Sequence, residues 1–478
     1  MAKLRQDTAL ISELKTQIAS QENEIAHRRQ QAIQVEDLKA EIAELRERLD
    51  QNSRNSHRPP SSDPPSQTQK PKSEPRGRKR GGQPGHHGHS RQLKPVAEVD
   101  HIIELRPTSC TQCGHLLMGD DPAPSRHQVS EVPRVQAEVT EYRRHTLRCL
   151  ACDAENQAAW PAEMSMGSFG PRVQATIGYL TGRLGVSHRD VTEVMAVLHG
   201  LEVGLGSVCV IQQQVGDALA EPVTVAQQFV EQQKAQYVDE TGWPEGAQQK
   251  WLWVNATSDV TVFRVLSGRS TADAKQVINE SAKGIVGTDR YGAYNWLEGR
   301  RRQICWAHLA RDFQAMVDRG GESQKIGQAL LKQVKRIFKL WHQLRDGDLS
   351  RESFQRAIKP VEERVKKLLE AGIQSEHEKT QRTCQNILKV EESLWTFVRV
   401  EGVEPTNNAA ERGLRRAVLW RKKSFGTQST EGSRFVERIL STITTLRQQG
   451  RDVLDYLTGA CRAALGSQSP SSLVPDSS

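Results

Sequence analysis

The chain has 478 residues, too many for one ordinary domain, and hydrophobic residues make up 36% of it. That share is below the roughly 45–50% of a typical globular protein, so part of the chain is expected to lie outside any core. The formal net charge of +8 suits a polyanionic partner without identifying one. The N-terminal residues lack the apolar core of a signal peptide, and no segment approaches the roughly 18–20 apolar residues of a membrane span. We therefore expect a cytoplasmic protein with no membrane partner.

Residues 1–50 are predicted to form one long helix with a narrow apolar seam. Leu4, Ile11, Ile18 and Ile25 are spaced by sevens, and a second apolar run over residues 35–49 continues in a shifted frame. This pattern favours a leucine-zipper-like coiled coil and a homo-oligomer. The alternative is a single amphipathic helix that folds back onto the rest of the protein.

Residues 51–95 are interpreted as a disordered linker followed by a basic arm. The linker is rich in Ser, Pro and Gln and has almost no large apolar residue. The arm places cations among glycines and histidines, a composition that cannot form a core but can neutralise phosphates. A solvated basic tail is the alternative. The arm residues assigned to DNA binding are Arg76, Arg78, Lys79 and Arg80.

Residues 96–160 contain two CxxC pairs among short β-like segments. Cys110 and Cys113 form the first pair, and Cys149 and Cys152 form the second. Together they supply the four thiolates that structural zinc prefers, which predicts a small zinc-binding, DNA-binding module. A pair of redox CxxC motifs is the alternative, but such motifs usually occur singly in a thioredoxin-like context.

The remaining residues predict a helical region and then an α/β core. Residues 161–232 look helical, and SHRDVTEVM with the helix that follows resembles a helix-turn-helix. Over residues 233–430, three strands, a helix and two strands are followed by a helical insertion at about 311–400 and a helix that Thr406 or Asn407 can cap. This order matches a ribonuclease-H-like α/β catalytic core. Residues 431–478 are predicted to form C-terminal helices and a disordered tail.

Three carboxylates fall at compatible places in this order. Asp239 and Asp289 each follow the apolar residues of a predicted strand, at the sheet edge where α/β sites gather, and Glu411 lies early in the last helix of the core. Carboxylates at close range need a cation, and two divalent ions are the usual partner in phosphodiester chemistry. Mg²⁺ or Mn²⁺ is expected, because hard cations prefer oxygen ligands. Taken singly, each residue has a structural alternative, and Glu240 competes with Asp239.

Several longer motifs carry a specific resemblance. GRKRGGQPGHHGH, the two CxxC pairs, YVDETGW, DRYGAY, CWAHLARDF and NNAAERGLRR are similar to the insertion sequence 66 family of DDE transposases over nearly the whole chain. The resemblance implies that Asp239, Asp289 and Glu411 are the catalytic, metal-holding triad. It also implies that the four paired cysteines hold zinc. One position departs from the family pattern. An arginine often stands two residues after CxAH, where this chain has Ala310, and Arg311 comes next.

The resemblance further implies a bacterial, nucleoid-associated protein from a mobile element. Its substrates would be double-stranded DNA of the element ends and of the target, with accessory proteins of the same element as partners. The predicted reaction is hydrolysis of a phosphodiester at the element end, followed by attack of the freed 3′-OH on target DNA. The alternatives are a nuclease without strand transfer and a non-catalytic DNA-binding regulator.

Basic, aromatic and histidine side chains accompany the predicted carboxylates in the sequence. Arg415, Arg421 and Lys422 follow Glu411 and are predicted to hold phosphates, with an ordinary basic helix face as the alternative. The indoles of Trp243 and Trp306 could stack on a splayed base or fill the core. His308 is assigned no role.

Overall fold

The computed structural model describes residues 2–56, 63, 91–161, 164, 167–466 and 468–475. These residues belong to two compact units, one comprising Met1–Pro64, Tyr142–Glu193 and Val203–Ser478, and the other Pro65–Glu141 and Val194–Glu202. The predicted basic arm from Arg76 to Arg80 lies outside the described residues, as does most of the predicted linker. No helix in the described part of the chain is long and apolar enough to cross a membrane.

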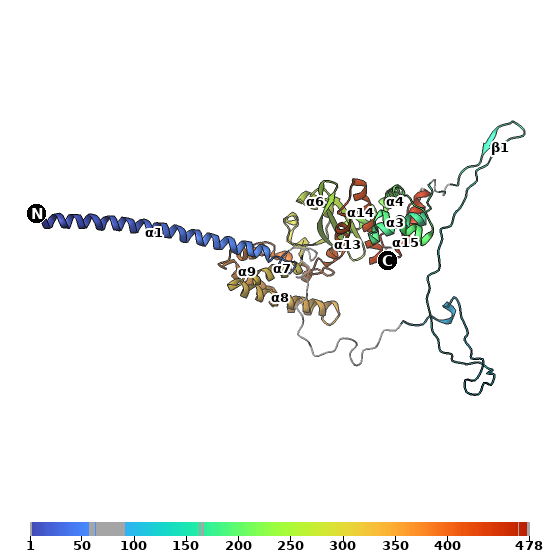
Figure 1. The fold of residues 1–478 in the computed structure, drawn as a ribbon, viewed down its shortest axis with the longest axis horizontal. Coiled ribbons are helices and arrows are strands. Elements are labelled where there is room, and N and C mark those ends of the chain that lie inside the picture. The colour runs from blue at the N-terminus through green and yellow to red at the C-terminus, as the bar shows by residue number, and fades with distance from the viewer. Residues whose placement is uncertain are drawn as a thin grey trace. The chain divides into compact units, whose positions relative to one another are not determined.

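The N-terminal segment forms the single long helix that the sequence predicts. Helix α1 runs without a break from Ala2 to Leu49 (Figure 1). Its seam residues are open to solvent, with Ile18 55% exposed, Ile25 51% and Leu38 56%. An exposed apolar seam in two frames favours pairing with another helix, and the coiled coil stays a prediction.

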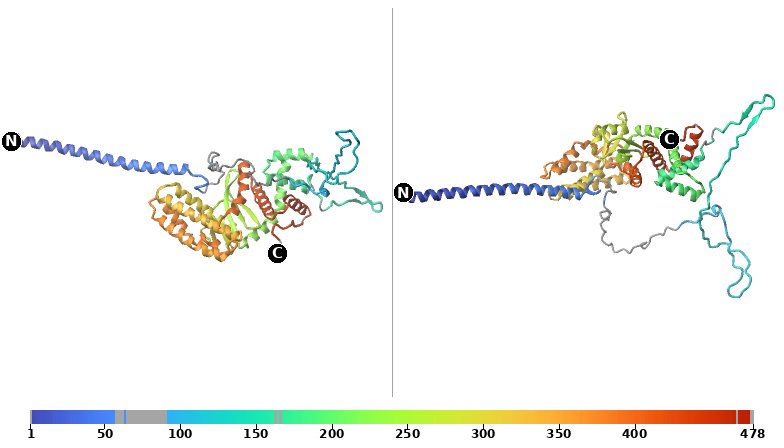
Figure 2. Two further views of the ribbon diagram at one scale, coloured as in Figure 1. Left: turned by 90° about the horizontal axis from the view of Figure 1, so that it is seen from below. Right: turned by 45° about the horizontal axis from the view of Figure 1, so that its top comes forward.

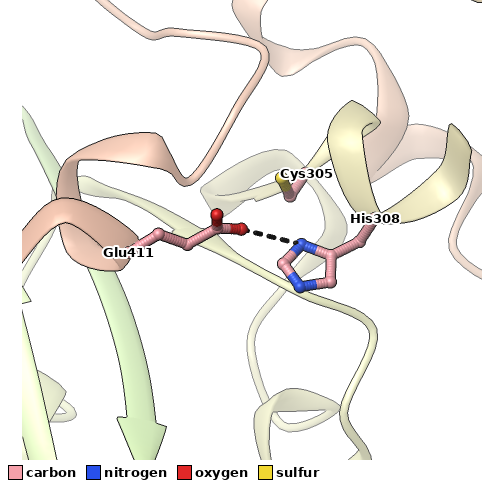
Figure 3. A group of neighbouring side chains, drawn as sticks. All are labelled: Cys305, His308 and Glu411. Atoms are coloured by element: carbon pink, nitrogen blue, oxygen red, sulfur yellow. Dashed lines mark ion pairs between the residues drawn. The ribbon is translucent and has the colours of Figure 1, made fainter. Parts of the chain in front are cut away.

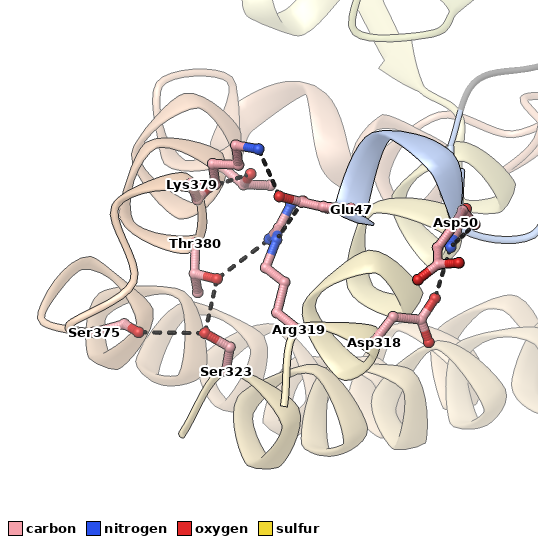
Figure 4. A network of polar contacts seen from close by, with 10 residues as sticks. Glu47, Asp50, Asp318, Arg319, Ser323, Ser375, Lys379 and Thr380 are labelled. Carbon is pink, nitrogen blue, oxygen red and sulfur yellow. Dashed lines mark hydrogen bonds and ion pairs between the residues drawn. The ribbon is translucent and has the colours of Figure 1, made fainter. Parts of the chain in front are cut away.

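The last turn of α1 is anchored on the helical insertion (Figure 4). Glu47 accepts hydrogen bonds from Arg319 Nε at 3.1 Å and from Lys379 Nζ at 2.5 Å. Just beyond the helix, Asn55 Nδ2 donates to Asp318 Oδ2 at 2.8 Å. Partial burial alone would raise the pKa of Glu47, but Lys379 and Arg319 outweigh it and lower that pKa below its usual value.

A five-stranded mixed sheet forms the centre of the larger unit. The strands are β3 (Ala235–Glu245), β4 (Gln248–Ala256), β5 (Thr261–Leu266), β6 (Ile285–Thr288) and β7 (Arg302–Ile304). They lie in the order β5-β4-β3-β6-β7, in which β4 is antiparallel to β3 and β5, and β6 is parallel to β3 and β7. Helix α6 (Thr271–Ile278) connects β5 to β6. The predicted chain order of three strands, a helix and two strands is confirmed.

Two predicted strand boundaries are wrong. Strand β3 continues through Asp239 to Glu245, because β4 pairs with it over its full length. The apolar residues of RQICWAHL predict a strand that continues to Leu309, but strand β7 ends at Ile304 and the following residues form helix α7 (Trp306–Asp318). The apolar residues of this segment recur every three or four positions, which is the helical period, and they are buried on one face of α7.

Each face of the sheet carries its own core. The side chains of β3 alternate, so that Tyr237 and Trp243 pack beneath α13 (Asn408–Ser424) and α14 (Thr430–Gln448), whereas Val238 packs on the face covered by α6. Trp243 and Trp306 are fully buried. Of the two alternatives given by the sequence, both indoles therefore fill the core and are not available to stack on a DNA base.

The charged segment after β7 forms the predicted helical insertion, which lies beside the sheet (yellow to orange in Figure 2). After α7 it continues with five helices that share an apolar core of their own. These are α8 (Gly321–Arg345), α9 (Arg351–Ile373), α10 (Glu378–Leu388), α11 (Glu391–Leu394) and α12 (Thr396–Arg399).

Helices also form before and after the core. Those before it are α2 (Pro171–Tyr179), α3 (His188–His199), α4 (Leu205–Ala218) and α5 (Ala220–Glu231). The last helix, α15 (Val453–Leu465), packs against α2. The predicted helix-turn-helix stays a prediction.

Part of the C-terminal tail differs from the predicted disorder. Leu473 is fully buried, and Gln449 Nε2 donates to its carbonyl at 2.8 Å. The hydroxyl of Tyr456 donates to the carbonyl of Ser471 at 2.7 Å. One apolar side chain and a few backbone hydrogen bonds therefore hold this stretch against the helices.

We predict that Glu47→Gln weakens the anchor of α1. The free energy of unfolding should fall by about 1 kcal/mol at pH 7, the upper range for a partly exposed ion pair. Because the folded-state pKa of Glu47 is lowered, the advantage of the wild type is present above its unfolded pKa and lost as the pH falls through the folded value. Hydrogen exchange over residues 44–56 and thermal unfolding between pH 3 and pH 7 would measure it.

Glu44→Gln, on the exposed part of the same helix, is the matched control and should behave as the wild type. If hydrogen exchange and thermal unfolding of Glu47→Gln matched those of Glu44→Gln at pH 7, the ion pairs of Glu47 would contribute nothing to stability.

Candidate functional site

The sheet register brings the two predicted aspartates together. Strand β6 pairs in parallel with β3, with Gly287 opposite Tyr237. Continuing this register by two residues places Asp289 opposite Asp239, on neighbouring strands about 4.8 Å apart. Asp239 is therefore not at the end of its own strand, but it lies at the edge where β6 ends. Both side chains are half-buried.

Glu411 reaches the same edge from the first turn of α13. Asn407 stands at the N-cap of this helix, as one of the two residues proposed for that position, but its side chain does not cap the helix. Instead, Asn407 Nδ2 donates to the carbonyl of Val238 at 2.9 Å, directly before Asp239. Farther along, a Cβ at Gly413 would come within 3.3 Å of Val254 Cγ2, so glycine allows the helix to pack closely on β4.

The pKa shifts of these carboxylates agree with the placement that the sheet register and α13 give them. Burial raises the pKa of Asp239 well above its usual value, and the charges of Glu240, Asp289 and Glu411 raise it further. Burial also raises the pKa of Glu411, with a further increase from Asp289 that Arg311 and Arg412 oppose. Clustered oxygen donors that resist ionising without a counter-charge fit a hard divalent cation. Asp239, Asp289 and Glu411 would hold it.

A fourth carboxylate, Glu240, lies on the opposite face of β3 from Asp239. It accepts a hydrogen bond from the hydroxyl of Tyr294 at 2.5 Å, and Tyr294 itself is fully buried. Burial raises the pKa of Glu240 to about 7, against the effect of this hydrogen bond and with a contribution from Asp289. Glu240 is thus held on the other face of β3 by the buried Tyr294.

Arg302 fixes the loop that carries Asp289, a role that the sequence pattern did not reveal. Its guanidinium is 2% exposed and donates to the carbonyl of Asp289 at 2.8 Å and to Thr288 Oγ1 at 3.0 Å. Tyr291 N in turn donates to Asp289 Oδ1 at 2.8 Å. Burial lowers the pKa of Arg302 to about 10, so the side chain remains a cation at neutral pH.

The CWAHLARD segment places three side chains beside Glu411. His308 Nδ1 lies 3.5 Å from Glu411 Oε1, and Arg311 Nη2 lies 3.6 Å from the same oxygen. Cys305, His308 and Glu411 form a group whose potential metal-ligand atoms all lie within 4.8 Å of one another (Figure 3). His308 therefore contacts a predicted catalytic residue directly, and Arg311 supplies a cation there in place of the arginine absent at Ala310.

The predicted phosphate-binding residues after Glu411 occupy different surroundings. Arg421 is half-buried, and its Nη1 donates to Thr241 Oγ1 at 3.0 Å and to the carbonyl of Gly242. Arg421 thus ties α13 to β3. Arg415 and Lys422 are exposed, and for them phosphate binding stays a prediction.

The two CxxC pairs form matching turns, one in each unit. Cys110 N donates to the carbonyl of His115, and Cys149 N donates to that of Ala154, both at 2.8 Å. Backbone N–H groups of Gln112 and Cys113 lower the pKa of Cys110, and those of Ala151 and Cys152 lower the pKa of Cys149. Such turns favour thiolates, the form that binds zinc.

The β-like segments expected around these turns are mostly not formed. The second turn lies between β1 (Thr146–Arg148) and β2 (Glu155–Gln157), which pair as a short antiparallel ribbon. Among the described residues 99–145 there is only the isolated bridge between Ser109 and Leu116. The alternating pattern of this segment does not produce strands, because its large apolar side chains, such as Val132 and Val139, are exposed and not packed on a core.

Comparison with known families identifies the chain. The model of the IS66 family of transposases matches residues 166–434, more than half of the sequence, so the chain belongs to this family. The zinc-finger binding domain of transposase IS66 matches residues 107–153, which include both CxxC turns. Residues 3–92 match a family of unknown function (DUF6444). The chain is thus a transposase of an insertion sequence, with a zinc-finger domain.

Two curated relatives come from Sinorhizobium fredii (strain NBRC 101917 / NGR234). The uncharacterized protein y4qI is 26% identical over 424 residues, which cover 81% of this chain and 74% of the relative. The uncharacterized protein y4hP is 24% identical over 398 residues, which cover 75% of this chain and 71% of the relative. The likeness therefore spans most of each chain.

We predict that Asp239→Asn stabilises the protein when Mg²⁺ is omitted. Asparagine removes a charge that burial and the neighbouring carboxylates disfavour, so the unfolding midpoint should rise by roughly 2–4 °C, which corresponds to about 1 kcal/mol. Adding millimolar Mg²⁺ or Mn²⁺ should raise the unfolding midpoint of the wild type, and it should raise that of the variant much less. A lower midpoint for Asp239→Asn without metal would contradict the proposed crowding of charge.

We also predict that both CxxC turns are needed for zinc. Cys113→Ser and Cys152→Ser should each reduce bound zinc from about one ion per chain to near zero, because structural zinc uses four protein ligands. Elemental analysis of the purified protein would measure the zinc. Cys209→Ser changes an exposed cysteine outside the turns and should retain the metal. Unchanged zinc in Cys113→Ser would rule the first turn out as a ligand.

Proposed function

We propose that this transposase cleaves DNA at the ends of a bacterial insertion sequence and joins the freed 3′-OH to target DNA. The observation that carries the proposal is the convergence of Asp239, Asp289 and Glu411, with the raised pKa of Asp239 as its signature. The order of the strands and helices, with a helical insertion before α13, supports a ribonuclease-H-like core.

Asp239, Asp289 and Glu411 are the proposed ligands of Mg²⁺ or Mn²⁺. When bound there, divalent ions would supply an activated oxygen nucleophile and charge stabilisation for an in-line displacement. The protein holds the carboxylates ready for this chemistry. Arg302 fixes the Asp289 loop, Asn407 fixes the start of α13 against β3, and Arg311 contributes positive charge beside Glu411.

The remaining regions have proposed roles in binding and assembly. The four cysteines of the CxxC turns are the proposed zinc ligands of a DNA-binding module, supported by the zinc-finger match and by the lowered thiol pKa values. Helix α1 is the proposed oligomerisation element, supported by its exposed apolar seam. Double-stranded DNA of the element ends and target is the proposed substrate, with accessory proteins of the element as further partners.

The test is a cleavage and strand-transfer assay with DNA that carries an element end. We expect joined product from the wild type in Mg²⁺ or Mn²⁺, and a loss of at least about a hundredfold in Asp239→Asn, Asp289→Asn and Glu411→Gln, because each change removes an ionic ligand at the point where charge develops. Asp217→Asn alters an exposed carboxylate on α4 and should remain active.

Three outcomes would contradict the proposal in different ways. Cleavage without joining would indicate a nuclease. DNA binding without reaction in the wild type would indicate a regulator. Full activity of Asp289→Asn would show that the triad is wrongly assigned.

A further inference from the structure

A large groove lies next to the candidate active site in the core unit. Its volume is about 1080 Å³, and its walls come from the segment Gln232–Tyr237, the turn between β4 and β5, and one face each of α13 and α14. It is distinct from the carboxylate cluster, because none of Asp239, Asp289 and Glu411 lines it.

The groove is strongly cationic. Five positively charged side chains line it, against one carboxylate, that of Glu404. The cations are Arg183, Lys234, Arg412, Arg416 and Arg447. Within the described residues, none of these five forms an ion pair, whereas most ion pairs elsewhere occupy the outer surface. Unneutralised cations that converge on a concave surface create a positive potential, which attracts a polyanion.

The other lining side chains suit phosphate oxygens as well. Gln232, Gln233, Ser258 and Thr444 offer amide or hydroxyl groups along the walls. Such groups, together with arginines, make most of the contacts that proteins form with the sugar–phosphate backbone. One arginine is already fixed in place, because Arg416 Nη1 donates to the carbonyl of Arg183. The wall is thus partly organised before any ligand arrives.

Two elements of the candidate active site also form walls of the groove. On α13, Ala409, Arg412, Gly413 and Arg416 face the groove at helical spacing, while Glu411 projects to the carboxylate cluster. On β3, Tyr237 lines the groove and Asp239 follows two residues later on the same face of the strand, about 7 Å away. Because Glu411 lies on nearly the opposite side of α13 from these four residues, the groove and the carboxylate cluster flank α13 on different sides.

We propose that this groove binds the phosphodiester backbone of a DNA strand beside the segment that is held at the active site. The inference rests on the proposed function and adds a second contact surface for the substrate. Arg183 and Arg447, which stand on different helical segments, contact phosphates of this strand. The contacts are independent of base sequence, because backbone contacts position DNA without reading it.

The test compares the salt dependence of DNA binding in Arg183→Gln/Arg447→Gln with that of the wild type, without divalent metal so that no cleavage occurs. Each lost phosphate contact should reduce the slope of log K against log salt by about 0.7–0.9, and weaken binding roughly tenfold at 0.1 M salt. The weakening should be equal for element-end DNA and unrelated DNA. Arg412 and Arg416 are left intact, because Arg412 influences the pKa of Glu411 and Arg416 supports the wall.

Two controls isolate the groove. Arg356→Gln/Arg364→Gln removes the same charge from the exposed side of α9 and should keep the wild-type slope. Arg183→Lys/Arg447→Lys keeps the charge and should also bind like the wild type. If Arg183→Gln/Arg447→Gln shows the wild-type slope and affinity, or if α9 gives an equal loss, the groove proposal is overturned. Failure of the proposed function would differ, since the groove would still bind DNA while no variant or wild type cleaved it.

Discussion

Repulsion between carboxylates is the constraint on which the candidate site depends. Asp239, Asp289 and Glu411 are brought together by β3, β6 and α13, and the raised pKa values of Asp239 and Glu411 show that the fold opposes their ionisation. A folded chain keeps such an arrangement only when the rest of the structure supplies enough stability to impose it. The sheet pairing and the packing of α13 on β4 supply it here.

Two buried side chains, one neutral and one cationic, hold the segments that carry the carboxylates. Asn407 links the start of α13 to the carbonyl before Asp239, and Arg302 gathers the carbonyls and hydroxyl around Asp289. Neither side chain faces the carboxylates as a ligand. Since the hydrogen bonds lie in a region shielded from water, breaking one would leave a buried polar group unpaired. The positions of the carboxylates therefore depend on residues that take no part in the chemistry.

The sequence predicted the order of strands and helices in the core because the spacing of apolar residues is regular within each element. The alternating aromatic strands and the helical face of α13 were readable without tertiary information. The boundaries were not, since the extent of β3 depends on β4, which lies across the turn, and the CWAHLARDF helix looks like a strand if only its first apolar residues are considered. Asp239 was therefore assigned to the right edge of the sheet for a partly wrong reason.

The contacts between distant segments were beyond the sequence. Nothing near Glu47 marks its partners Arg319 and Lys379, because they lie far along the chain. Arg421 was assigned to phosphate, although it holds α13 to β3. The predicted disorder of the tail failed at Leu473 for the same reason. A single apolar residue among polar ones gains burial only from a surface that the rest of the fold provides.

Helix α7 connects two of these features. Its first turns place His308 and Arg311 beside Glu411, and Asp318 at its far end meets Asn55, next to Arg319, which binds Glu47 of α1. Ten residues of helix, about 15 Å, separate His308 from Asp318. The same helix therefore contacts both the segment at the end of α1 and the predicted catalytic Glu411.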